Sequence, residues 1–439
     1  MNLSELQRED LLNLFDSMCN ERSAPAKFEK GKSFIPCSGK VIGSEEIRLM
    51  IEAALDGWLT TGRFNAQFEK VLSNYLNIKE VITVNSGSSA NLIAISSLFS
   101  EKLGADRIRA GDEVITLAAG FPTTVNPIIQ NGAVPVFIDV MKNTYNADAG
   151  LLESALSQKT RAVVFAHTLG NPFDLHKVKK FCDKHTLFLV EDCCDALGST
   201  YDGKYVGTFG DISTLSFYPA HHITMGEGGA VMSNSQKLMS IARSIRDWGR
   251  DCYCEPGMDN TCGARFNQQL GNLPFGYDHK YTYSELGYNL KITDMQAACG
   301  LAQLRKLDGF IERRKVNFQY LKDQLREAEE FLVLPESTPG SDPSWFGFPI
   351  TLKDECPVDR NDLVAYLESK RIGTRLLFGG NLTKQPYMLN RYYRAAGPLE
   401  VTDKIMSNTF WVGVFPGIGN EELDFVAESI KLYLGVSFA

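Results

Sequence analysis

Short apolar runs alternate with helical patterns from about residue 80 onward, and this alternation limits the fold more than any other feature of the chain. The first runs lie at 81–84, 113–117 and 134–138, and a helical pattern begins at Ser88. Strands that are apolar at consecutive positions are buried on both faces, and strands that alternate with helices form parallel sheets. The sequence therefore predicts an α/β protein whose mostly parallel sheet is covered by helices on both faces.

The same patterns divide the chain into three parts. We predict an N-terminal helical segment at 1–40, a large domain at 41–310 and a smaller C-terminal α/β domain at 311–439. A long polar helix at about 301–330 leads from the large domain into the small one. The stretch at 250–280 is rich in Gly, Asn, Gln and Asp and has little periodicity, and a connection of that length is usually functional or disordered.

Composition excludes several classes of protein. Hydrophobic residues make up 44% and charged residues 22% of the 439 residues, which is ordinary for a globular chain and excludes disorder throughout. The net charge of −8 lacks the basic footprint of proteins that bind nucleic acid or membrane surfaces. No run approaches the roughly 20 apolar residues of a bilayer span, and the first ten residues are too polar for a signal peptide. We therefore expect a cytoplasmic protein.

Two segments carry residue types suited to binding a phosphorylated ring. Residues 85–91 read Asn-Ser-Gly-Ser-Ser-Ala-Asn between a strand and a helix, where Gly87 permits close backbone approach and the serines can hold a phosphate. The serines could equally serve only to cap the helix. Asp192 ends a buried strand, where open α/β sheets place their ligands, and its carboxylate suits a protonated ring nitrogen or a helix cap.

The segment 216–229 reads Ser-Phe-Tyr-Pro-Ala-His-His-Ile-Thr-Met-Gly-Glu-Gly-Gly, and 287–291 reads Gly-Tyr-Asn-Leu-Lys. Together with the two segments above, they resemble the pyridoxal-phosphate-dependent nucleotide-sugar aminotransferases of fold type I, the DegT-like family, over about residues 40–435. The resemblance implies a seven-stranded, mostly parallel sheet between helices and a smaller C-terminal domain. The family has a lysine where this chain has His221, and no lysine lies between Lys204 and Lys237.

The histidine changes the chemistry that the resemblance implies. An imidazole forms no stable imine with an aldehyde, so the cofactor would be held non-covalently, as pyridoxamine 5′-phosphate. With an ordinary pKa of about 6.5, an imidazole can still act as a base near neutral pH. His221 would remove the C4′ proton, and a hydroxyl next to the former ketone of the substrate would then leave. The resemblance therefore implies dehydration in place of amino transfer.

The resemblance also assigns residues to the cofactor. Asp192 would pair with the pyridine nitrogen, and Asp195 would lie near the 3′ oxygen of the ring. The phosphate would be held by the serine-rich loop and Ser216, and Asn289 would reach the phosphate of a neighbouring subunit, which implies a homodimer. Phe121 would stack on the ring. The full set is Gly87, Ser88, Ser89, Phe121, Asp192, Asp195, Ser216 and Asn289.

Four of the ten cysteines have a spacing typical of a metal site, namely Cys194, Cys252, Cys254 and Cys262. Four thiolates suit a [2Fe–2S] cluster or a structural zinc ion. Neighbours on a strand point to opposite faces, so inspection leaves open whether Cys193 or Cys194 is the ligand. The spacing and the histidine together resemble the family branch that dehydrates CDP-linked 4-keto-6-deoxy sugars at C3, which favours iron and Cys194.

That branch implies a full reaction. The substrate would be a CDP-linked 4-keto-6-deoxy sugar on the way to a 3,6-dideoxyhexose such as ascarylose. The cluster would relay electrons from a partner, an NAD(P)H-dependent flavin/iron–sulfur reductase. The alternative keeps the dehydration without a redox cluster and releases a 3-deoxy sugar and ammonia. His167, at the end of a predicted strand, either lines this site or fills the core.

Overall fold

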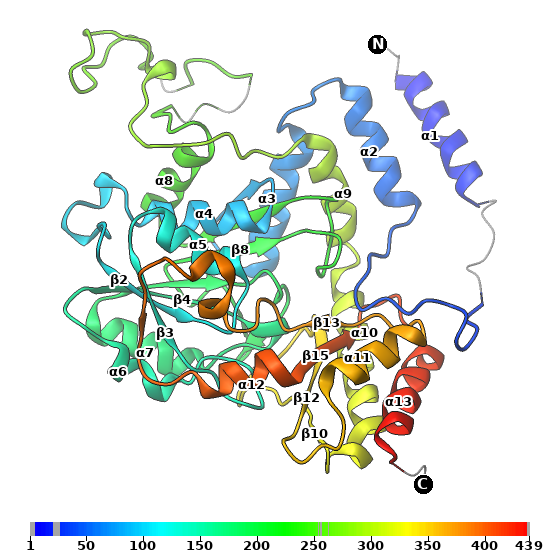
Figure 1. The fold of residues 1–439 in the computed structure, drawn as a ribbon. Helices are drawn as coiled ribbons and strands as arrows, with labels where there is room; N and C mark the ends of the chain where they lie inside the picture. The colour runs from blue at the N-terminus through cyan, green and yellow to red at the C-terminus, as the bar shows by residue number, and fades with distance from the viewer. Residues whose placement is uncertain (1–4, 21–26, 253, 255–256, 262, 437–439) are drawn as a thin grey trace.

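A large, mostly parallel sheet forms the centre of the molecule (Figure 1). The structure is a computed structural model, and it describes residues 5–20, 27–252, 254, 257–261 and 263–436. In the order in which they pair, the strands are β1 (Glu80–Val84), β9 (Gly229–Ser233), β8 (Ile212–Ser216), β5 (Phe188–Asp192), β4 (Thr160–Ala166), β2 (Glu113–Leu117), β3 (Val134–Ile138) and β14 (Arg394–Ala395). Strand β9 pairs antiparallel with both β1 and β8, and the remaining neighbours are parallel.

The sheet has one strand more than the predicted seven. Strand β14 comes from the C-terminal part of the chain and adds parallel to β3, pairing Arg394 with Val136 and Ala395 with Phe137. The guanidinium of Arg394 donates two hydrogen bonds to the carboxylate of Glu113, at 2.8 and 3.2 Å. This ion pair holds the two-residue strand against the sheet. Local hydrophobic periodicity could not predict the presence of this strand.

Helices cover both faces of this sheet, as the apolar runs predicted. Along β4, Ala162 and Val164 belong to one core and Val163 and Phe165 to the other, because successive side chains point to opposite faces. The helices of the first face are α4 (Gly87–Ser97), α5 (Pro122–Gln130) and α8 (Gln236–Arg246). Those of the second are α3 (Arg63–Leu76), α6 (Leu152–Ala155), α7 (Leu175–His185) and α9 (Asp294–Leu304).

A second, smaller sheet lies beside the first and has its own core. Its strands, in order, are β10 (Leu332–Val333), β12 (Gly347–Leu352), β15 (Thr409–Gly413) and β13 (Arg375–Leu376). Its helices are α10 (Leu307–Leu325), α11 (Arg360–Ser369), α12 (Glu400–Asn408) and α13 (Asn420–Leu434). A three-stranded ribbon comprises β11 (Ser341–Asp342), β6 (Thr200–Tyr201) and β7 (Lys204–Tyr205). The long polar helix predicted at 301–330 is divided, since α9 ends at Leu304 and α10 begins at Leu307.

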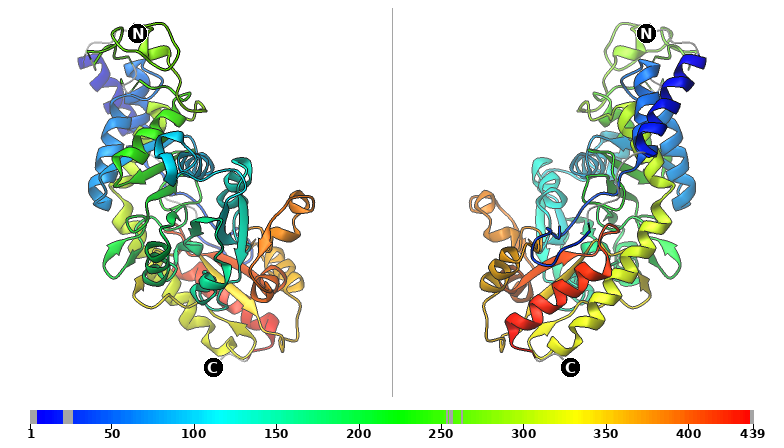
Figure 2. Two further views of the ribbon diagram at one scale, coloured as in Figure 1. Left: turned by 90° about the vertical axis from the view of Figure 1, so that its left-hand side faces the viewer. Right: turned by 90° about the vertical axis from the view of Figure 1, so that its right-hand side faces the viewer.

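The N-terminal helices α1 (Glu5–Asn20) and α2 (Ser44–Asp56) lie at the opposite end of the molecule from the C-terminal helix α13 (Figure 2). The segment 250–280 extends beyond α8 as irregular chain, with no helix longer than one turn in its described part (Figure 1). Of the helices in the described ranges, none combines the length and apolar character that crossing a membrane requires.

Candidate active site

The carboxylate of Asp192 lies at the carboxyl end of β5 and is buried, with 5% of its surface exposed. Its Oδ2 accepts hydrogen bonds from Asn91 Nδ2 at 2.8 Å and Thr124 Oγ1 at 2.7 Å. Its Oδ1 accepts from the backbone N–H of Cys194 at 3.1 Å and from Thr214 Oγ1 at 3.5 Å. Among the described residues, no lysine or arginine forms an ion pair with this carboxylate. A buried anion held only by neutral donors suits a cationic ligand such as a pyridinium.

Sequence reasoning missed three residues that hold Asp192. Asn91 comes from α4, Thr124 from α5 and Thr214 from β8, and Thr214 also donates to Asn91 Oδ1 at 2.7 Å. Asn91 is the last residue of the serine-rich segment 85–91, and Thr124 follows Phe121 by three positions. A buried amide in α4 and buried hydroxyls in α5 and β8 were the available signal, but only the tertiary structure brings them to one carboxylate.

The serine-rich loop forms the start of helix α4. Ser86 is its N-cap, and Ser86 Oγ accepts from the N–H of Ser89 at 3.1 Å, so the cap interpretation of this segment holds for Ser86. Ser88 is exposed and Ser89 is half-buried, with Ser89 Oγ donating to Asn85 Oδ1 at 2.6 Å. The first N–H groups of a helix have no partner within it and carry partial positive charge, which suits an anion.

Gly87 and Ser216 lie against each other at this helix start. A Cβ at position 87 would lie 2.5 Å from Ser216 Cβ, 2.8 Å from Ser216 Oγ and 2.9 Å from Cys194 Sγ. Ser216 ends β8, and Gly229 begins β9 with its Cα against the backbone of Ser86 and Gly87. The absence of side chains at these two glycines therefore leaves a narrow cradle between the helix start and Ser216. The N–H groups of the helix start and the Ser216 hydroxyl are donors that suit the phosphate of the expected cofactor.

His221 follows β8 in the loop that leads to β9, and its imidazole meets the second carboxylate of the segment after β5. Its Nε2 lies 3.3 Å from Asp195 Oδ1, and the two side chains are 15% and 12% exposed. The ring of Phe346 flanks the imidazole, with centroids 5.2 Å apart. Nδ1 is buried without a hydrogen-bond partner among the described residues. The structure therefore brings His221 and Asp195 together, a contact that the sequence analysis did not predict.

The neighbouring histidine has a different environment. His222 is 3% exposed, and its Nε2 is hydrogen-bonded to the carbonyl oxygen of Ser344. Burial, assisted by the positive charge of Arg314, lowers the pKa of His222 well below the ordinary value of 6.5. A neutral imidazole fixed to a carbonyl has a structural role, whereas the His221 side chain is 15% exposed and contacts a carboxylate.

Phe121 and Asn289 lie at the periphery of these groups. Phe121 precedes α5 and is 52% exposed, with its ring 6.3 Å from that of Phe378. Asn289 is also exposed, and its Oδ1 accepts from Lys291 Nζ at 2.8 Å. The next residue, Leu290, accepts a backbone hydrogen bond from Asn85 at 2.8 Å, which places Asn289 beside the serine-rich loop. Both side chains are accessible to a ligand or to a second subunit.

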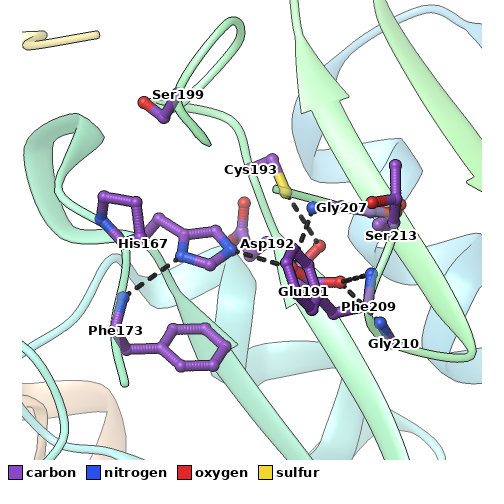
Figure 3. Close-up of polar contacts among 12 residues, drawn as sticks. His167, Phe173, Glu191, Asp192, Cys193, Ser199, Gly207, Phe209, Gly210 and Ser213 are labelled. Carbon is purple, nitrogen blue, oxygen red and sulfur yellow. Dashed lines mark hydrogen bonds and ion pairs between the residues drawn. The ribbon is translucent and has the colours of Figure 1, made fainter. Parts of the chain in front are cut away.

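The Glu191–His167 pair lies on the other side of the β5 strand end (Figure 3). Both side chains are fully buried, and Glu191 accepts hydrogen bonds from the backbone N–H groups of Gly207, Phe209 and Gly210. The N–H of Phe173 donates to His167 Nδ1, so the ring proton lies on Nε2, 3.2 Å from Glu191 Oε2.

This pair answers the question left open about His167, because the side chain fills the core and does not line the site. His167, Glu191 and Cys193 lie within 4.8 Å of one another, yet a protonated Nε2 offers no lone pair to a metal ion. The backbone N–H of His167 donates to the carbonyl of Asp192 at 3.1 Å. The network therefore fixes the strand end that carries Asp192.

The predicted cysteine set is spread over two parts of the fold. Cys194 Sγ borders the cradle, while Cys193 is 1% exposed and its thiol points to the carbonyl of Glu191. Cys252 and Cys254 belong to the 250–280 segment, and Cys262 lies outside the described residues. Within the described ranges, Cys194 forms no group of three potential ligands with Cys252 and Cys254.

Burial raises the pKa of the Cys194 thiol well above its ordinary value of 9, and the adjacent carboxylate of Asp192 raises it further. A metal ion binds the thiolate and displaces this proton, so ligation by Cys194 would release a proton.

Comparison with known proteins shows relatives along nearly the whole chain. The profile of the DegT/DnrJ/EryC1/StrS aminotransferase family matches residues 40–431. The lipopolysaccharide biosynthesis protein RfbH of Salmonella typhimurium is 60% identical over 431 residues, which are 98% of this chain and 99% of that protein. The dTDP-4-dehydro-2,6-dideoxy-D-glucose 3-dehydratase of Saccharopolyspora spinosa is 51% identical, over 95% of this chain and 90% of its own length.

A solved structure agrees with this relationship. The E. coli GDP-4-keto-6-deoxy-D-mannose-3-dehydratase with bound hydrated PLP superposes with a TM-score of 0.81 at 27% identity. The match covers 91% of this chain and 99% of that one. The fold is therefore that of fold type I pyridoxal-phosphate enzymes, as the sequence predicted.

Proposed function

The chain is an enzyme of the DegT/DnrJ/EryC1/StrS aminotransferase family, and we propose that it removes the C3 hydroxyl of a nucleotide-linked 4-keto-6-deoxy sugar with pyridoxamine phosphate as its cofactor. The observation that carries the proposal is His221, which lies 3.3 Å from Asp195 at the position where the family's tethering lysine is expected. Two relatives whose names specify 3-dehydratases of nucleotide-linked keto sugars support this reaction class.

Bound pyridoxamine phosphate supplies an amine that condenses with the 4-keto group and a pyridinium that accepts electrons. Asp192 would pair with that pyridinium, because it is the buried carboxylate held by neutral donors. The cradle at Gly87 and Ser216, with Ser88 and Ser89, would hold the phosphate. His221 Nε2 would accept the C4′ proton, and Asp195 would orient the imidazole and stabilise its charged form.

The site would be completed by a second copy of the chain. Asn289 is exposed beside the serine-rich loop, and we place it at the phosphate of the neighbouring subunit in a homodimer. Phe121, which is 52% exposed, would cover the cofactor ring when the site is filled. Contact with the cofactor would bury apolar surface of the Phe121 ring that is exposed to water in the described chain.

For the nucleotide we propose cytidine diphosphate. This choice rests on the sequence resemblance, since the names of the relatives specify dTDP-linked and GDP-linked sugars. The product would be the precursor of a 3,6-dideoxyhexose of the ascarylose type.

We further propose that Cys194, Cys252, Cys254 and Cys262 hold a [2Fe–2S] cluster that receives electrons from an NAD(P)H-dependent flavin/iron–sulfur reductase. This proposal rests on the spacing of the cysteines in the sequence. Cys262 lies outside the described residues, and the described cysteines of the set form no group of three ligands, so no step of the reaction is derived through the cluster. Iron and acid-labile sulfide analysis of anaerobically purified protein tests it, with about two of each per chain expected.

A second candidate is dehydration without a redox step. Among the described residues Cys194 forms no group of three ligands with Cys252 and Cys254, and the roles proposed for His221 and Asp195 require no cluster. The dehydrated product would then be hydrolysed to a 3-deoxy sugar and ammonia. Absence of iron, together with release of ammonia in the absence of any reductase, would select this reaction.

The proposal is tested by incubating the pyridoxamine-phosphate-loaded enzyme with 4-keto-6-deoxy sugars linked to CDP, dTDP or GDP in ¹⁸O-labelled water. Reversible loss of the C3 hydroxyl introduces ¹⁸O at C3, or ammonia is released, and mass spectrometry detects both. The His221→Asn variant is expected to do neither, while His176→Asn, at an exposed ion pair with Asp202, serves as the matched control. A 4-amino sugar as the product, or no change in any of the three sugars, would contradict the proposal.

A further inference from the structure

A buried guanidinium lies behind His221 and takes no part in the chemistry described so far. Arg314, on helix α10, is 1% exposed and is the largest fully buried side chain among the described residues. No carboxylate forms an ion pair with it in the part of the chain that the structure describes. Burial of an unpaired cation is unfavourable, so a side chain that only filled space would be better replaced by an apolar one.

The hydrogen bonds of Arg314 all go to backbone carbonyls around the imidazole. Its Nη1 donates to the carbonyls of Trp345 at 3.1 Å and Phe346 at 3.2 Å, and its Nη2 donates to the carbonyl of His221 at 3.3 Å. One side chain thus joins the loop after β8 to the segment that enters β12. These segments lie more than 120 residues apart in the sequence.

One of the joined segments carries the imidazole of His221, and the other places the ring of Phe346 beside it. The ring of Phe346 lies 5.2 Å from that of His221, and on the other side Nε2 lies 3.3 Å from Asp195. Because Arg314 holds the backbone of both His221 and Phe346, it limits how far the imidazole can tilt away from Asp195. A rotation about the loop would break at least one of these hydrogen bonds.

We propose that Arg314 is a positioning residue for the base, and that it holds His221 Nε2 toward Asp195 and the reacting carbon by binding the three carbonyls. The inference rests on the proposed function, since it assigns to Arg314 the orientation of the group that removes the C4′ proton. Arg314 itself touches neither the cofactor nor the substrate in this account.

Several charged or titratable groups surround the same imidazole. The charged and titratable groups that face His221 are Asp195 from the segment after β5, Tyr218 and His222 from its own loop, and Lys40 and Arg314 across a common cavity. Burial lowers the pKa of Arg314 to about 9, with Asp195 opposing the change, so the guanidinium is charged at neutral pH.

The test compares Arg314→Met, Arg314→Lys and the control Arg313→Met. Arg313 is the adjacent residue on α10, and its side chain donates to the carbonyl of Ile418, away from the imidazole. In Arg314→Met the rate constant for C4′ proton exchange should fall by about 10²-fold, because a displaced base loses near-attack geometry. The KM for the sugar and the affinity for pyridoxamine phosphate should stay at the wild-type values. Arg314→Lys, which keeps the charge and fewer donors, should lie between the two.

A second readout is independent of turnover. The chain has six histidines, so the signal of His221 in protein labelled with [¹³Cε1]histidine is assigned by its absence in His221→Asn. The chemical shift of that signal should change in Arg314→Met, where the carbonyls around the ring lose their donor, should change less in Arg314→Lys, and should stay at the wild-type value in Arg313→Met. If the methionine variant does not fold, the lysine variant carries the test through its loss of exchange rate at unchanged cofactor affinity.

Two results would overturn the inference. One is C4′ exchange in Arg314→Met or in a folded Arg314→Lys at the wild-type rate, and the other is a loss of exchange matched by Arg313→Met. The His221→Asn variant separates this failure from that of the proposed function. If His221→Asn abolishes exchange while the Arg314 variants do not affect it, only the role of Arg314 is wrong, whereas persistence of exchange in His221→Asn removes the base itself.

Discussion

Substitution of Gly87 by alanine tests the phosphate cradle, because the structure gives the space available there. The added Cβ would lie 2.5 Å from Ser216 Cβ, 2.8 Å from its Oγ and 2.9 Å from Cys194 Sγ. Carbon atoms in ordinary contact are about 3.5–4.0 Å apart, so Ser216 must move by about 1 Å. Overpacking of this kind typically costs about 1–3 kcal/mol.

The cost should appear in cofactor binding as well as in stability. Rotation about the Cα–Cβ bond of Ser216 moves only its Oγ, so Ser216 Cβ and the helix start must separate, which displaces the hydroxyl and the N–H groups that a bound phosphate requires. Converted at 1.4 kcal/mol per tenfold, the cost corresponds to about 5- to 150-fold weaker binding of pyridoxamine phosphate. The assay is a titration of the cofactor-free protein followed by cofactor absorbance, with Gly309→Ala as the control, since an added Cβ at Gly309 meets nothing within 4 Å. Wild-type affinity in Gly87→Ala would refute the placement of the phosphate, even if the variant melts at a lower temperature.

Three further predictions follow from the contacts of single residues. Asp192→Asn keeps the hydrogen bond from Thr124 but removes the negative charge. The rate of C4′ exchange should therefore fall by about 10²–10³-fold while the cofactor still binds. An undiminished exchange rate would exclude the pairing of Asp192 with the cofactor ring. Burial opposes ionisation of Glu113, but the hydrogen bonds from Arg394 outweigh it and hold the pKa of Glu113 below its usual range. The Glu113–Arg394 pair therefore stabilises the fold fully above the ordinary pKa of 4.5. This stabilisation is lost as the pH falls through the lowered pKa. Arg394→Met should therefore unfold in urea with about 1–2 kcal/mol less stability at pH 7 and with a difference that shrinks toward pH 3; a difference independent of pH would contradict this. Burial raises the pKa of Cys299 to about 11, so its thiol should resist a thiol reagent at pH 8 in the folded protein and react once unfolded, and rapid labelling of the folded protein would show the residue to be accessible.

The parallel strands of the large sheet could be predicted from the sequence because their information is local. Runs such as 113–117 and 134–138 are apolar at consecutive positions, and both became strands with the expected bounds. Strand β14 could not be predicted, because Arg394 and Ala395 pair with a strand more than 250 residues earlier and form no pattern of their own. The break between α9 and α10 was also missed, since the polar helical pattern continues through Arg305 and Lys306.

Residues of the candidate site that stand in a motif could be proposed from the sequence. The residues that hold them in place could not. Asp192 and His221 stand in recognisable segments, whereas Thr214 is one more residue of a buried strand until the fold brings it to the carboxylate. Arg314 belongs to a polar helix that looks like a solvated surface in the sequence, yet it is fully buried. Burial of charged groups by distant segments cannot be seen in helical periodicity, because it depends on which elements pack together.

The central claim is that the imidazole of His221 is the base, and loss of label from the cofactor tests it most directly. Pyridoxamine phosphate carrying deuterium at C4′ is bound to the wild-type enzyme and to His221→Asn, and mass spectrometry follows its deuterium content after a nucleotide-linked 4-keto-6-deoxy sugar is added. We expect the wild-type enzyme to release one of the two deuterons and the variant to retain both while still binding cofactor and sugar. Release of deuterium by His221→Asn at the wild-type rate would show that another group removes the proton.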